Sequence, residues 1–580
     1  MNSENRNCQN CKHEFTIDSE DFSFYEKIQV PPPTFCPECR LIRRLMWRNE
    51  RNLYKRNCVT ENGEKVLLSN YHPDIKTPVY EEKYWWGDKW DPIVYGQEYD
   101  FSKPFFEQLK ELIQKVPVPH ATNVQISNSD YCNFTYQSKN CYLAFASDIN
   151  EDCAYLHRTL KSKNSINLEG CENMEACANS YRSTGCYESS NVYFSFSCIK
   201  SHLMWDCHNC QDCYGCVGLR NKSNCIFNVQ YSKEEYKEKI KSYVNGSYQT
   251  QKNNLKLFFE MTIKYPRKFA DILLSQNVSG DYIHHAKNCH YCFDVANKVE
   301  DCKYCAYAFS NMSSCYDVYA GGVNYEMSYE TTASGENAQR LFMCAMTWTS
   351  SDMYYSLFCN KSSNCFGCVS LSNKKYCILN KQYTKEEYEE LLPKIIAQMN
   401  EMPYIDVVHN EYKFGEFFPP ELSPFAYNET PAEEFFPLPK NEVLNKGYTW
   451  RDKEKSKYPI TLKVEDIPDN INDIPDSIVN EVIECADSSQ DYSPGAFRVI
   501  PIELALYKRL KVPLPRKSPA ARYFELLKYN NPHDLWHRSC MCEEGSHGHD
   551  GKCQNEFETS YAPERPEIIY CESCYQKEVI

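Results

Sequence analysis

The sequence predicts a multidomain protein in which two α+β modules, one at each end, flank a mainly-β repeat region with inserted helices. Three observations predict this architecture: paired cysteines near both ends, a duplication that relates the two ends, and short cysteine-containing units that recur between them. The chain has 580 residues, of which 42% are hydrophobic and 25% charged. This length and composition are typical of a globular chain with several cores.

Composition and charge exclude several classes of protein. The net charge of −15 argues against a general nucleic-acid coat. No apolar run reaches the roughly 18 residues of a membrane-spanning helix, and the first residues contain no apolar signal core. We therefore expect a cytoplasmic protein without membrane contact, in which thiols stay reduced. Its 33 cysteines then indicate metal ligands and buried thiols rather than disulfides.

The first module, residues 1–95, contains two closely spaced cysteine pairs. "CQNC" and "CPEC" form a C-x2-C-x24-C-x2-C pattern from Cys8, Cys11, Cys36 and Cys39. Two such knuckles complete a tetrahedral, four-thiolate zinc site, which is structural because it has no open position. Its binding energy would stabilise a segment too small to form its own core. The alternative is four unpaired thiols.

The stretches "CQNCKHEFTI", "FYEK" and "CPECRLIRR" carry a family resemblance. Over residues 8–44 the chain resembles a treble-clef-type zinc-ribbon family of bacterial proteins. Over nearly its full length it is similar to cysteine-rich zinc-ribbon proteins of uncultured small-genome bacteria. The resemblance implies zinc, but it implies no activity, because these families have none assigned.

A helix is expected directly after Cys39. Leu41, Leu45, Ile42 and Met46 recur on one side of it. Arginines interleaved with an aromatic residue can grip phosphates and stack on bases. The candidate nucleic-acid patch comprises Arg40, Arg43, Arg44, Trp47, Arg48 and Arg51 within the basic stretch Arg40–Arg56. The alternative, which we favour, is a solvated helix face that pairs with acidic residues.

The last module, residues 481–580, is a copy of the first. With an offset of 482, Arg522 falls on Arg40 and Cys540 on Cys58; after an eight-residue insertion the offset is 490. The positions of the first four zinc ligands hold Gln490, Ser493, Ser518 and Ala521. The segment "FRVIPIELALYKRLKVPLP" is more apolar than its counterpart, so we expect hydrophobic burial to replace the lost ion there.

This second copy has its own set of candidate ligands. We expect Cys571 and Cys574 to form one knuckle. The remaining two ligands would come from Cys540, Cys542, Cys553, His547 and His549. The His-Gly-His loop is equally compatible with an exposed segment that binds nothing. Together the two modules predict about two Zn²⁺ ions per chain.

Between the modules a second duplication, with an offset of 152, relates "CYGCVGLRNKSNCIFNVQYSKEEY" to "CFGCVSLSNKKYCILNKQYTKEEY". Ser102 is expected to cap a helix, and Ser232 with Glu235 and Thr384 with Glu387 form predicted capping boxes. The expected order is a helical linker (96–125), a first cysteine-rich half (126–231), a helical insert (232–278), a second half (279–383), a helix (384–402) and an extended Pro/Phe/Glu-rich connector (403–480).

The two halves contain 22 of the cysteines, in units where Asn, Asp or Ser precedes Cys and an aromatic-rich stretch follows. Turn residues at intervals of 9–15 residues favour a β-solenoid or parallel β-helix, with small cysteines stacked inside and Asn at the corners. The alternative is an antiparallel β-sandwich.

Two cysteine runs in these halves have spacings that suit metals. "CHNCQDCYGC" (Cys207, Cys210, Cys213, Cys216) is similar to an iron–sulfur run, but its last gap is two residues and no proline follows. In a strand, a three-residue spacing also points alternate cysteines to opposite faces. The other run comprises Cys289, Cys292, Cys302 and Cys305. For both we expect reduced thiols packed as core and no iron–sulfur cluster.

Functionally, the pattern favours a zinc-stabilised scaffold or interaction protein that binds a protein partner or itself. An RNA- or ribosome-associated protein using the arginine patch is the alternative. A β-helix enzyme acting on carbohydrate is a second alternative, and it needs carboxylates that converge on one face. Spacing reveals no such set and no assembled catalytic site, which favours a role other than catalysis.

Overall fold

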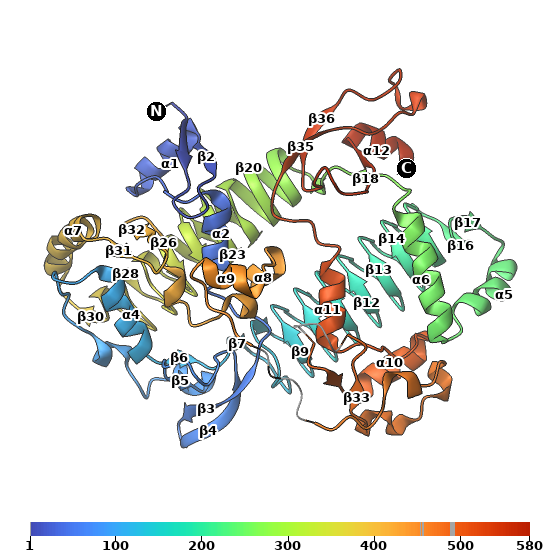
Figure 1. Ribbon diagram of the computed structural model, residues 1–580, viewed down its shortest axis with the longest axis horizontal. Coiled ribbons are helices and arrows are strands. Elements are labelled where there is room, and N and C mark those ends of the chain that lie inside the picture. Colours follow the sequence, from blue (N-terminus) through green and yellow to red (C-terminus); the bar gives the residue numbers. More distant parts are fainter. Residues whose placement is uncertain (1, 453, 455–457, 488–492, 580) are drawn as a thin grey trace.

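The computed structural model describes residues 2–452, 454, 458–487 and 493–579, and two stacks of short strands form its centre (Figure 1). The first stack spans 123–230 and the second 272–382. The first contains β7 (Asn123–Val124), β8 (Thr135–Tyr136), β9 (Tyr142–Phe145), β10 (Ala154–His157), β11 (Ile166–Glu169), β12 (Ala178–Tyr181), β13 (Ser190–Tyr193), β14 (His202–Trp205), β15 (Gln211–Val217), β16 (Ser223–Ile226) and β17 (Val229–Gln230). The second contains β19 (Ile272–Leu273), β20 (Gln276–Lys303), β21 (Ala306–Phe309), β22 (Met312–Ser313), β23 (Tyr316–Gly321), β24 (Tyr325–Glu326), β25 (Tyr329–Thr332), β26 (Ala338–Ala345), β27 (Ser351–Tyr354), β28 (Ser363–Phe366), β29 (Lys375–Ile378) and β30 (Lys381–Gln382).

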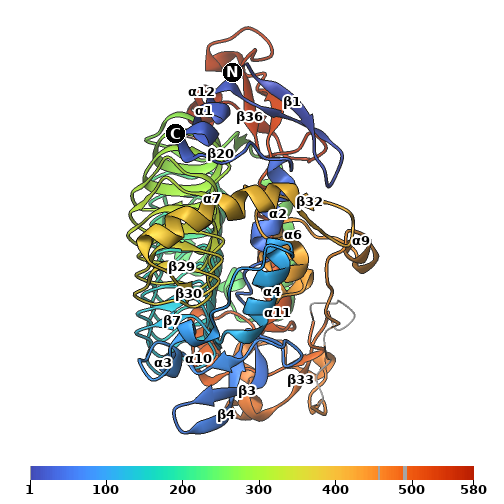
Figure 2. The same cartoon turned by 90° about the vertical axis from the view of Figure 1, so that its left-hand side faces the viewer.

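Successive strands of each stack pair in parallel at a nearly constant register. In the first stack Ala154 pairs with Ile166, twelve residues on, and Ile166 pairs with Ala178. In the second stack the step is thirteen residues at Ala306–Tyr319 and twelve at Ser363–Lys375. Parallel pairing excludes the antiparallel sandwich for the described residues. Figure 2 shows the successive layers from the side.

The backbone of the first stack has a period of three. From Phe134 to Gly215 every third residue has a left-handed backbone, for example Asn140 with φ 53° and Asp152 with φ 54°. The residue after each of these points inward, and every third residue from Cys132 to Cys216 is at most 3% exposed. Asn, Asp and Gly tolerate the left-handed conformation best, which explains their frequency just before a cysteine.

This period corrects one prediction and confirms another. The run Cys207–Cys216 does not alternate between faces, because the left-handed residues turn the chain and bring all four thiols into one interior. The prediction that asparagines stack at the corners is confirmed, since Nδ2 of Asn311 donates to Oδ1 of Asn324 at 2.8 Å and Asn324 donates likewise to Asn337 at 2.8 Å.

Helices flank both stacks: α4 (Phe105–Lys115), α5 (Lys233–Tyr243), α6 (Tyr248–Thr262) and α7 (Lys385–Glu401). The predicted capping boxes at Ser232 and Thr384 are confirmed. The predicted cap at Ser102 is wrong, because α4 begins after Pro104 and the Ser102 hydroxyl instead donates to Asp100. At the last layer of each stack the strand turns back as an antiparallel hairpin, β16–β17 or β29–β30. Helices α5 and α7 pack on these hairpins.

The two end modules contain the same elements at the predicted offsets. Helices α1 (Ser19–Ile28) and α2 (Pro37–Leu45) recur 482 residues later as α10 (Pro501–Leu510) and α11 (Pro519–Leu527), and β5 (Val79–Tyr80) recurs 490 residues later as β37 (Ile569–Tyr570). The first module also contains β1 (Glu4–Asn7), β2 (Glu14–Ile17), β3 (Tyr54–Thr60), β4 (Gly63–Ser69), α3 (Glu82–Trp85) and η1 (Pro92–Tyr95). The last also contains β33 (Ile483–Glu484), β34 (Ala496–Phe497), β35 (Trp536–Ser539), η7 (Gly545–His547), β36 (Glu556–Thr559) and α12 (Glu572–Val579).

Each end module contacts both stacks, and the two arrangements cross. Helix α2 packs on β23 and β25 of the second stack, whereas β5 pairs with β6 (Val118–Pro119), which leads into the first. Conversely, α11 packs on β11 of the first stack, whereas β37 pairs with β18 (Arg267–Lys268), which leads into the second. Equivalent elements of the two modules therefore contact opposite stacks, and each module connects one stack to the other (Figure 1).

The connector, residues 403–480, lies across these contacts, as predicted for an extended segment packed over other parts. Phe417 and Phe418 are fully buried. Its short elements are β31 (Tyr404–Ile405), β32 (Glu411–Tyr412), η2 (Pro420–Leu422), η3 (Tyr427–Glu429), α8 (Pro431–Phe435), α9 (Lys440–Asn445), η4 (Val464–Asp466), η5 (Ile471–Asp473) and η6 (Asp476–Asn480). Among all described residues, no helix combines the length and apolar character needed to cross a membrane.

Replacing an inward serine by a larger residue tests the narrow interior. The Ser183 hydroxyl donates to the carbonyls of Tyr181 and Val192 and accepts from the Ser195 amide at 3.2 Å. Ser183→Leu overfills the interior and leaves the Ser195 amide without an acceptor. We therefore expect the free energy of unfolding to fall by about 2–5 kcal/mol. Thermal unfolding followed by circular dichroism measures it. Thr184→Leu, one residue on and partly exposed, is the control; an equal loss in both variants would contradict the inward assignment.

Candidate metal centres and the buried polar network

The first cysteine cluster lies where the predicted zinc site was placed. The sulfurs of Cys8, Cys11, Cys36 and Cys39 all lie within 4.8 Å of one another, and those of Cys11 and Cys36 are 3.6 Å apart. Thiolates around one tetrahedral zinc ion are roughly 3.8 Å apart, given a Zn–S distance of about 2.3 Å. Cys36 and Cys39 lie at the start of α2, where the helix dipole favours negative charge. This group can hold a metal ion such as zinc.

The second cluster contains four of the five candidate cysteines of the C-terminal module. The sulfurs of Cys540, Cys553, Cys571 and Cys574 lie within 4.8 Å of one another. Cys571 and Cys574 form the expected knuckle at the start of α12, and Cys540 and Cys553 complete the set from the β35–β36 loop. All four are at most 6% exposed. This group can also hold a metal ion.

In the C-terminal module, other interactions occupy the place of the first site. The Ser518 hydroxyl accepts a hydrogen bond from the Ala521 amide and caps α11, so a helix cap replaces a metal ligand there. Gln490 lies outside the described residues. Around this helix a buried apolar cluster includes Ile483, Cys485, Phe497, Val499, Leu504, Leu506, Tyr507, Leu510, Val512, Leu514 and Ala521. This is the hydrophobic burial that the sequence predicted in place of the ion.

The cysteines of the stacks lie among the apolar side chains of the two interiors. Burial raises the pKa of Cys132 and of Cys344 to about 12. These two thiols stay protonated at neutral pH, and a protonated thiol is a poor nucleophile and a poor metal ligand. In the two runs with metal-like spacing, hydrogen bonds from neighbouring thiols instead lower the pKa of Cys210 and Cys289. In the described part of the chain, the groups of Cys and His side chains that could hold a metal ion lie in the two end modules.

The arginines of α2 are not on a solvent-exposed face, which corrects the sequence prediction. Arg40, Arg43 and Arg44 are at most 2% exposed. Arg48 is 8% exposed and pairs with Glu50, Trp47 is 2% exposed, and the Arg51 side chain stacks on Tyr523. The cause is the second stack, which covers the helix and supplies carboxylates. These residues therefore do not form an accessible surface for nucleic acid in this structure.

Three carboxylates balance the three buried guanidinium groups of α2. Arg40 and Arg44 pair with Asp317 at 3.0 and 3.1 Å, on the outer side of β23. Arg43 pairs with Glu330 of β25 at 2.9 Å and with Glu416 of the connector at 3.0 Å. Removing one partner from such a buried set typically costs about 3–5 kcal/mol, because a charge is left uncompensated. The network therefore fixes the N-terminal module on the second stack.

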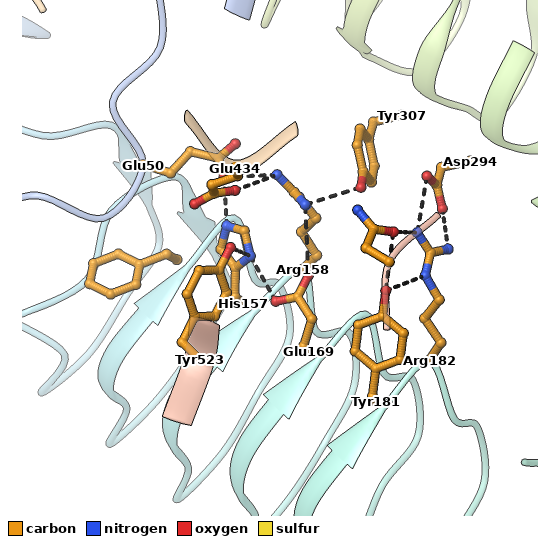
Figure 3. Close-up of polar contacts among 12 residues, drawn as sticks. Glu50, His157, Arg158, Glu169, Tyr181, Arg182, Asp294, Tyr307, Glu434 and Tyr523 are labelled. Carbon is orange, nitrogen blue, oxygen red and sulfur yellow. Dashed lines mark hydrogen bonds and ion pairs between the residues drawn. The ribbon is translucent and has the colours of Figure 1, made fainter. Parts of the chain in front are cut away.

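A second buried network joins every part of the molecule around His157 of β10 (Figure 3). His157 Nε2 lies 2.6 Å from Glu50 of the N-terminal module, and its Nδ1 lies 2.8 Å from Glu169 of the same stack. The hydroxyl of Tyr523, on α11, is 3.0 Å from the same Nδ1. Next to it, Arg158 contacts Tyr307 of the second stack at 3.0 Å and Glu434 of the connector at 3.4 Å.

The same interface continues at Arg182, which bridges the two stacks. Its guanidinium group pairs with Asp294 of β20 and donates to Asn530 Oδ1 at 3.0 Å. The Tyr181 hydroxyl donates to the same oxygen at 3.1 Å. Although carboxylates converge here, they are buried and ion-paired, so they differ from the exposed set that the carbohydrate-active alternative requires.

Sequence reasoning missed both networks because most of the paired groups lie more than a hundred residues apart, as do His157 and Glu50. One signal was present: Arg158, Arg182, Asp294, Asp317 and Glu330 all occupy left-handed positions of the three-residue period. These five charged residues lie where other parts of the molecule dock, but charged residues at the same kind of position elsewhere, such as Lys161 and Lys200, are exposed. Using this signal requires that the three-residue period of left-handed backbone positions is recognised first.

Comparisons with known proteins add little. A scan against protein-family models and a search of curated proteins found no match. Among solved structures, a proposed acetyltransferase from Desulfovibrio desulfuricans G20 is similar at 9% identity over 39% of this chain and 65% of that one. Its TM-score of 0.10 is too low to support an argument about fold or function. The zinc-ribbon resemblance therefore stays a prediction.

Replacing one ligand tests the first metal centre. We expect Cys39→Ser to lose one bound ion per chain and to loosen residues 2–45, because a small metal module depends on its ion for folding. Cys58→Ser is the matched control, since Cys58 is fully buried in the same module but lies outside the cluster. Metal analysis and amide hydrogen exchange measure both effects. Unchanged metal content in Cys39→Ser would mean that this cluster binds no ion.

The His157 network predicts a pH dependence. Burial acts to lower the pKa of His157, but Glu169 and Glu50 outweigh it and raise that pKa above the ordinary 6.5. The resulting stabilisation is complete below pH 6.5 and is lost as the pH rises through the raised folded-state pKa. We expect the melting temperature to fall across that range, and His157→Gln to be less stable at pH 6 by about 3–5 kcal/mol and to lack this fall. His537→Gln, at an exposed histidine paired with Glu558, is the control; if it removes the fall instead, His157 is not the titrating group.

Proposed function

We propose that the chain is a zinc-stabilised scaffold in which two β-solenoids are held side by side and present their outer faces to a protein partner. The observation that carries this proposal is the crossed arrangement of the end modules, each of which contacts both stacks: the first through α2 and Glu50, the last through α11 and β36. Buried ion pairs at these contacts resist relative motion, because separating the parts leaves charges uncompensated. Rigid, elongated repeat surfaces are typical of proteins that bind other proteins.

The solenoid interpretation rests on the constant parallel register and on the inward residues. One turn of chain per twelve or thirteen residues encloses little space, and most of the inward side chains are serines, cysteines and alanines, with larger ones such as Leu156, Leu168 and Met204 at fewer positions. The closing hairpins and helices α5 and α7 cover the last strand of each stack. Covered edges disfavour end-to-end assembly, so we infer that partners bind on the sides.

Zinc is the ion that the two four-cysteine clusters suit best. Closed sets of four thiolates favour zinc over hard cations such as magnesium and calcium, and they leave no open position for catalysis. Their place in the small end modules indicates a structural role.

The binding face that we propose lies on the outer side of the second stack. A groove of about 520 Å³ is lined by the exposed asparagine ladder Asn311, Asn324 and Asn337, with Gln339 and Lys361 beside it. The ladder holds amide donors and acceptors at fixed intervals. Such an array suits the peptide groups and polar side chains of a protein surface.

Site-specific photocrosslinking tests this function. A photoreactive residue at Gln339 is expected to capture a discrete protein in cells, and one at Val66, an exposed position on the β3–β4 hairpin, is expected not to. The captured protein, once purified, should bind the full chain about tenfold more weakly after Asn324→Ala, because a hydrogen-bonding group in the groove is lost. Asn140→Ala, in the equivalent ladder of the first stack, is the control. If Asn324→Ala and Asn140→Ala bind the partner equally well, the groove is not the binding face.

A further inference from the structure

The C-terminal module contains more metal-binding groups than one ion can use. Besides the four-cysteine cluster, Cys542, His549 and Cys574 place ligand atoms within 4.8 Å of one another, so Cys574 belongs to both groups. In addition, Nδ1 of His547 lies 3.1 Å from the sulfur of Cys542. Cys542, His547 and His549 all lie on the loop that is eight residues longer than its N-terminal counterpart. The insertion therefore supplies a second set of ligands that the N-terminal module lacks.

Both imidazole rings are oriented as metal ligands are. Nδ1 of His549 lies 2.8 Å from the carbonyl oxygen of Gly551, which can only accept, so that nitrogen carries the proton. Nε2 then has a free lone pair, and it lies 3.4 Å from the sulfur of Cys574. On His547 the Nδ1 faces Cys542 while Nε2 lies 3.7 Å from a carboxylate oxygen of Glu578. Metal-bound histidines characteristically use their second nitrogen for such a carbonyl or carboxylate contact.

The distances fit ligands that share an ion. For zinc with Zn–S of about 2.3 Å and Zn–N of about 2.0–2.1 Å, tetrahedral geometry places sulfur and nitrogen roughly 3.6 Å apart. The distance from Cys542 to His547 within the loop is 3.1 Å and that from Cys574 on α12 to His549 is 3.4 Å, and both are slightly shorter. A thiolate sulfur has several lone pairs and can therefore bind two ions at once. A second dication would also neutralise most of the negative charge that five neighbouring thiolates carry.

We propose that the C-terminal module holds a two-metal cluster in which the thiolate of Cys574 bridges an inner and an outer ion. The inner ion is bound by Cys540, Cys553, Cys571 and Cys574. The outer ion is bound by Cys574, Cys542 and His549, whose ligand atoms lie within 4.8 Å of one another, and His547, which contacts Cys542, completes the set as a fourth ligand. The full chain then binds three zinc ions, two of them in this cluster.

The two ions of the cluster differ in their access to solvent. The thiols of both ions are buried, with Cys542 0% and Cys574 1% exposed, but the outer ion lies beside a loop whose residues Gly545, Ser546, Gly548 and Asp550 are exposed. A chelator therefore reaches the outer ion first. Release of zinc from the module is expected in two steps, the first of which leaves the four-cysteine site intact.

Metal counting on the intact chain tests the proposal. Native mass spectrometry of the full-length protein loaded with zinc is expected to show three ions, and the double variant His547→Gln, His549→Gln is expected to show two. Both substitutions lie on the exposed loop and leave all cysteines in place, so the fold is retained. His537→Gln, an exposed histidine on β35, should keep three. Two ions in the unaltered protein, unchanged by the double substitution, would overturn the proposal.

Cadmium-113 NMR of the cadmium-loaded full chain tests the bridge itself. Two of three resonances should show mutual cadmium–cadmium coupling through the shared sulfur, and the double histidine variant should lose one resonance and the coupling together. Three uncoupled resonances would refute a bridging thiolate. Neither result affects the scaffold proposal, which needs only the two four-cysteine sites.

Discussion

A left-handed residue at every third position is the constraint on which the structure depends. It turns the chain so often that the parallel pairing recurs after twelve or thirteen residues, and it sends one side chain in three inward. Small residues dominate such an interior, so the stacks use mainly serine, cysteine and alanine, with a few larger side chains such as Leu156 and Met204, where a larger domain would rely on leucine and phenylalanine. The hydroxyls and thiols also hydrogen-bond to neighbouring backbone carbonyls, which satisfies polar groups that face inward.

Because the interiors are narrow, much of the large apolar and charged surface lies on the outside of the stacks. Aromatic residues and buried ion pairs on these outer faces bind the end modules and the connector. His157, Arg158 and Arg182 belong to the first stack, yet their partners come from every other part of the chain. The four-cysteine clusters, which can each hold a metal ion, lie within the small modules, while the buried charges determine where the modules dock.

Much of the layout could be predicted from local sequence. The cluster of Cys8, Cys11, Cys36 and Cys39 could be predicted from spacing alone, because a two-residue gap lets both cysteines of a knuckle reach the same ion. The capping boxes at Ser232 and Thr384 followed from short-range chemistry. The roles of Arg40, Arg43 and Arg44 could not be predicted, since their partners Asp317, Glu330 and Glu416 lie far away in the sequence and only the fold brings them together. The inward direction of Cys210 and Cys216 was also missed, because ordinary strand geometry does not apply to a chain that turns every third residue.

The crossed docking of the two ends has a consequence for synthesis on the ribosome. The N-terminal module is made first, but the carboxylates that neutralise its buried arginines, Asp317, Glu330 and Glu416, are translated hundreds of residues later. Until then those guanidinium groups stay hydrated and the helix stays undocked. The nascent chain thus carries an unattached leading segment until its second half emerges. Final assembly is a late, concerted event that involves both termini.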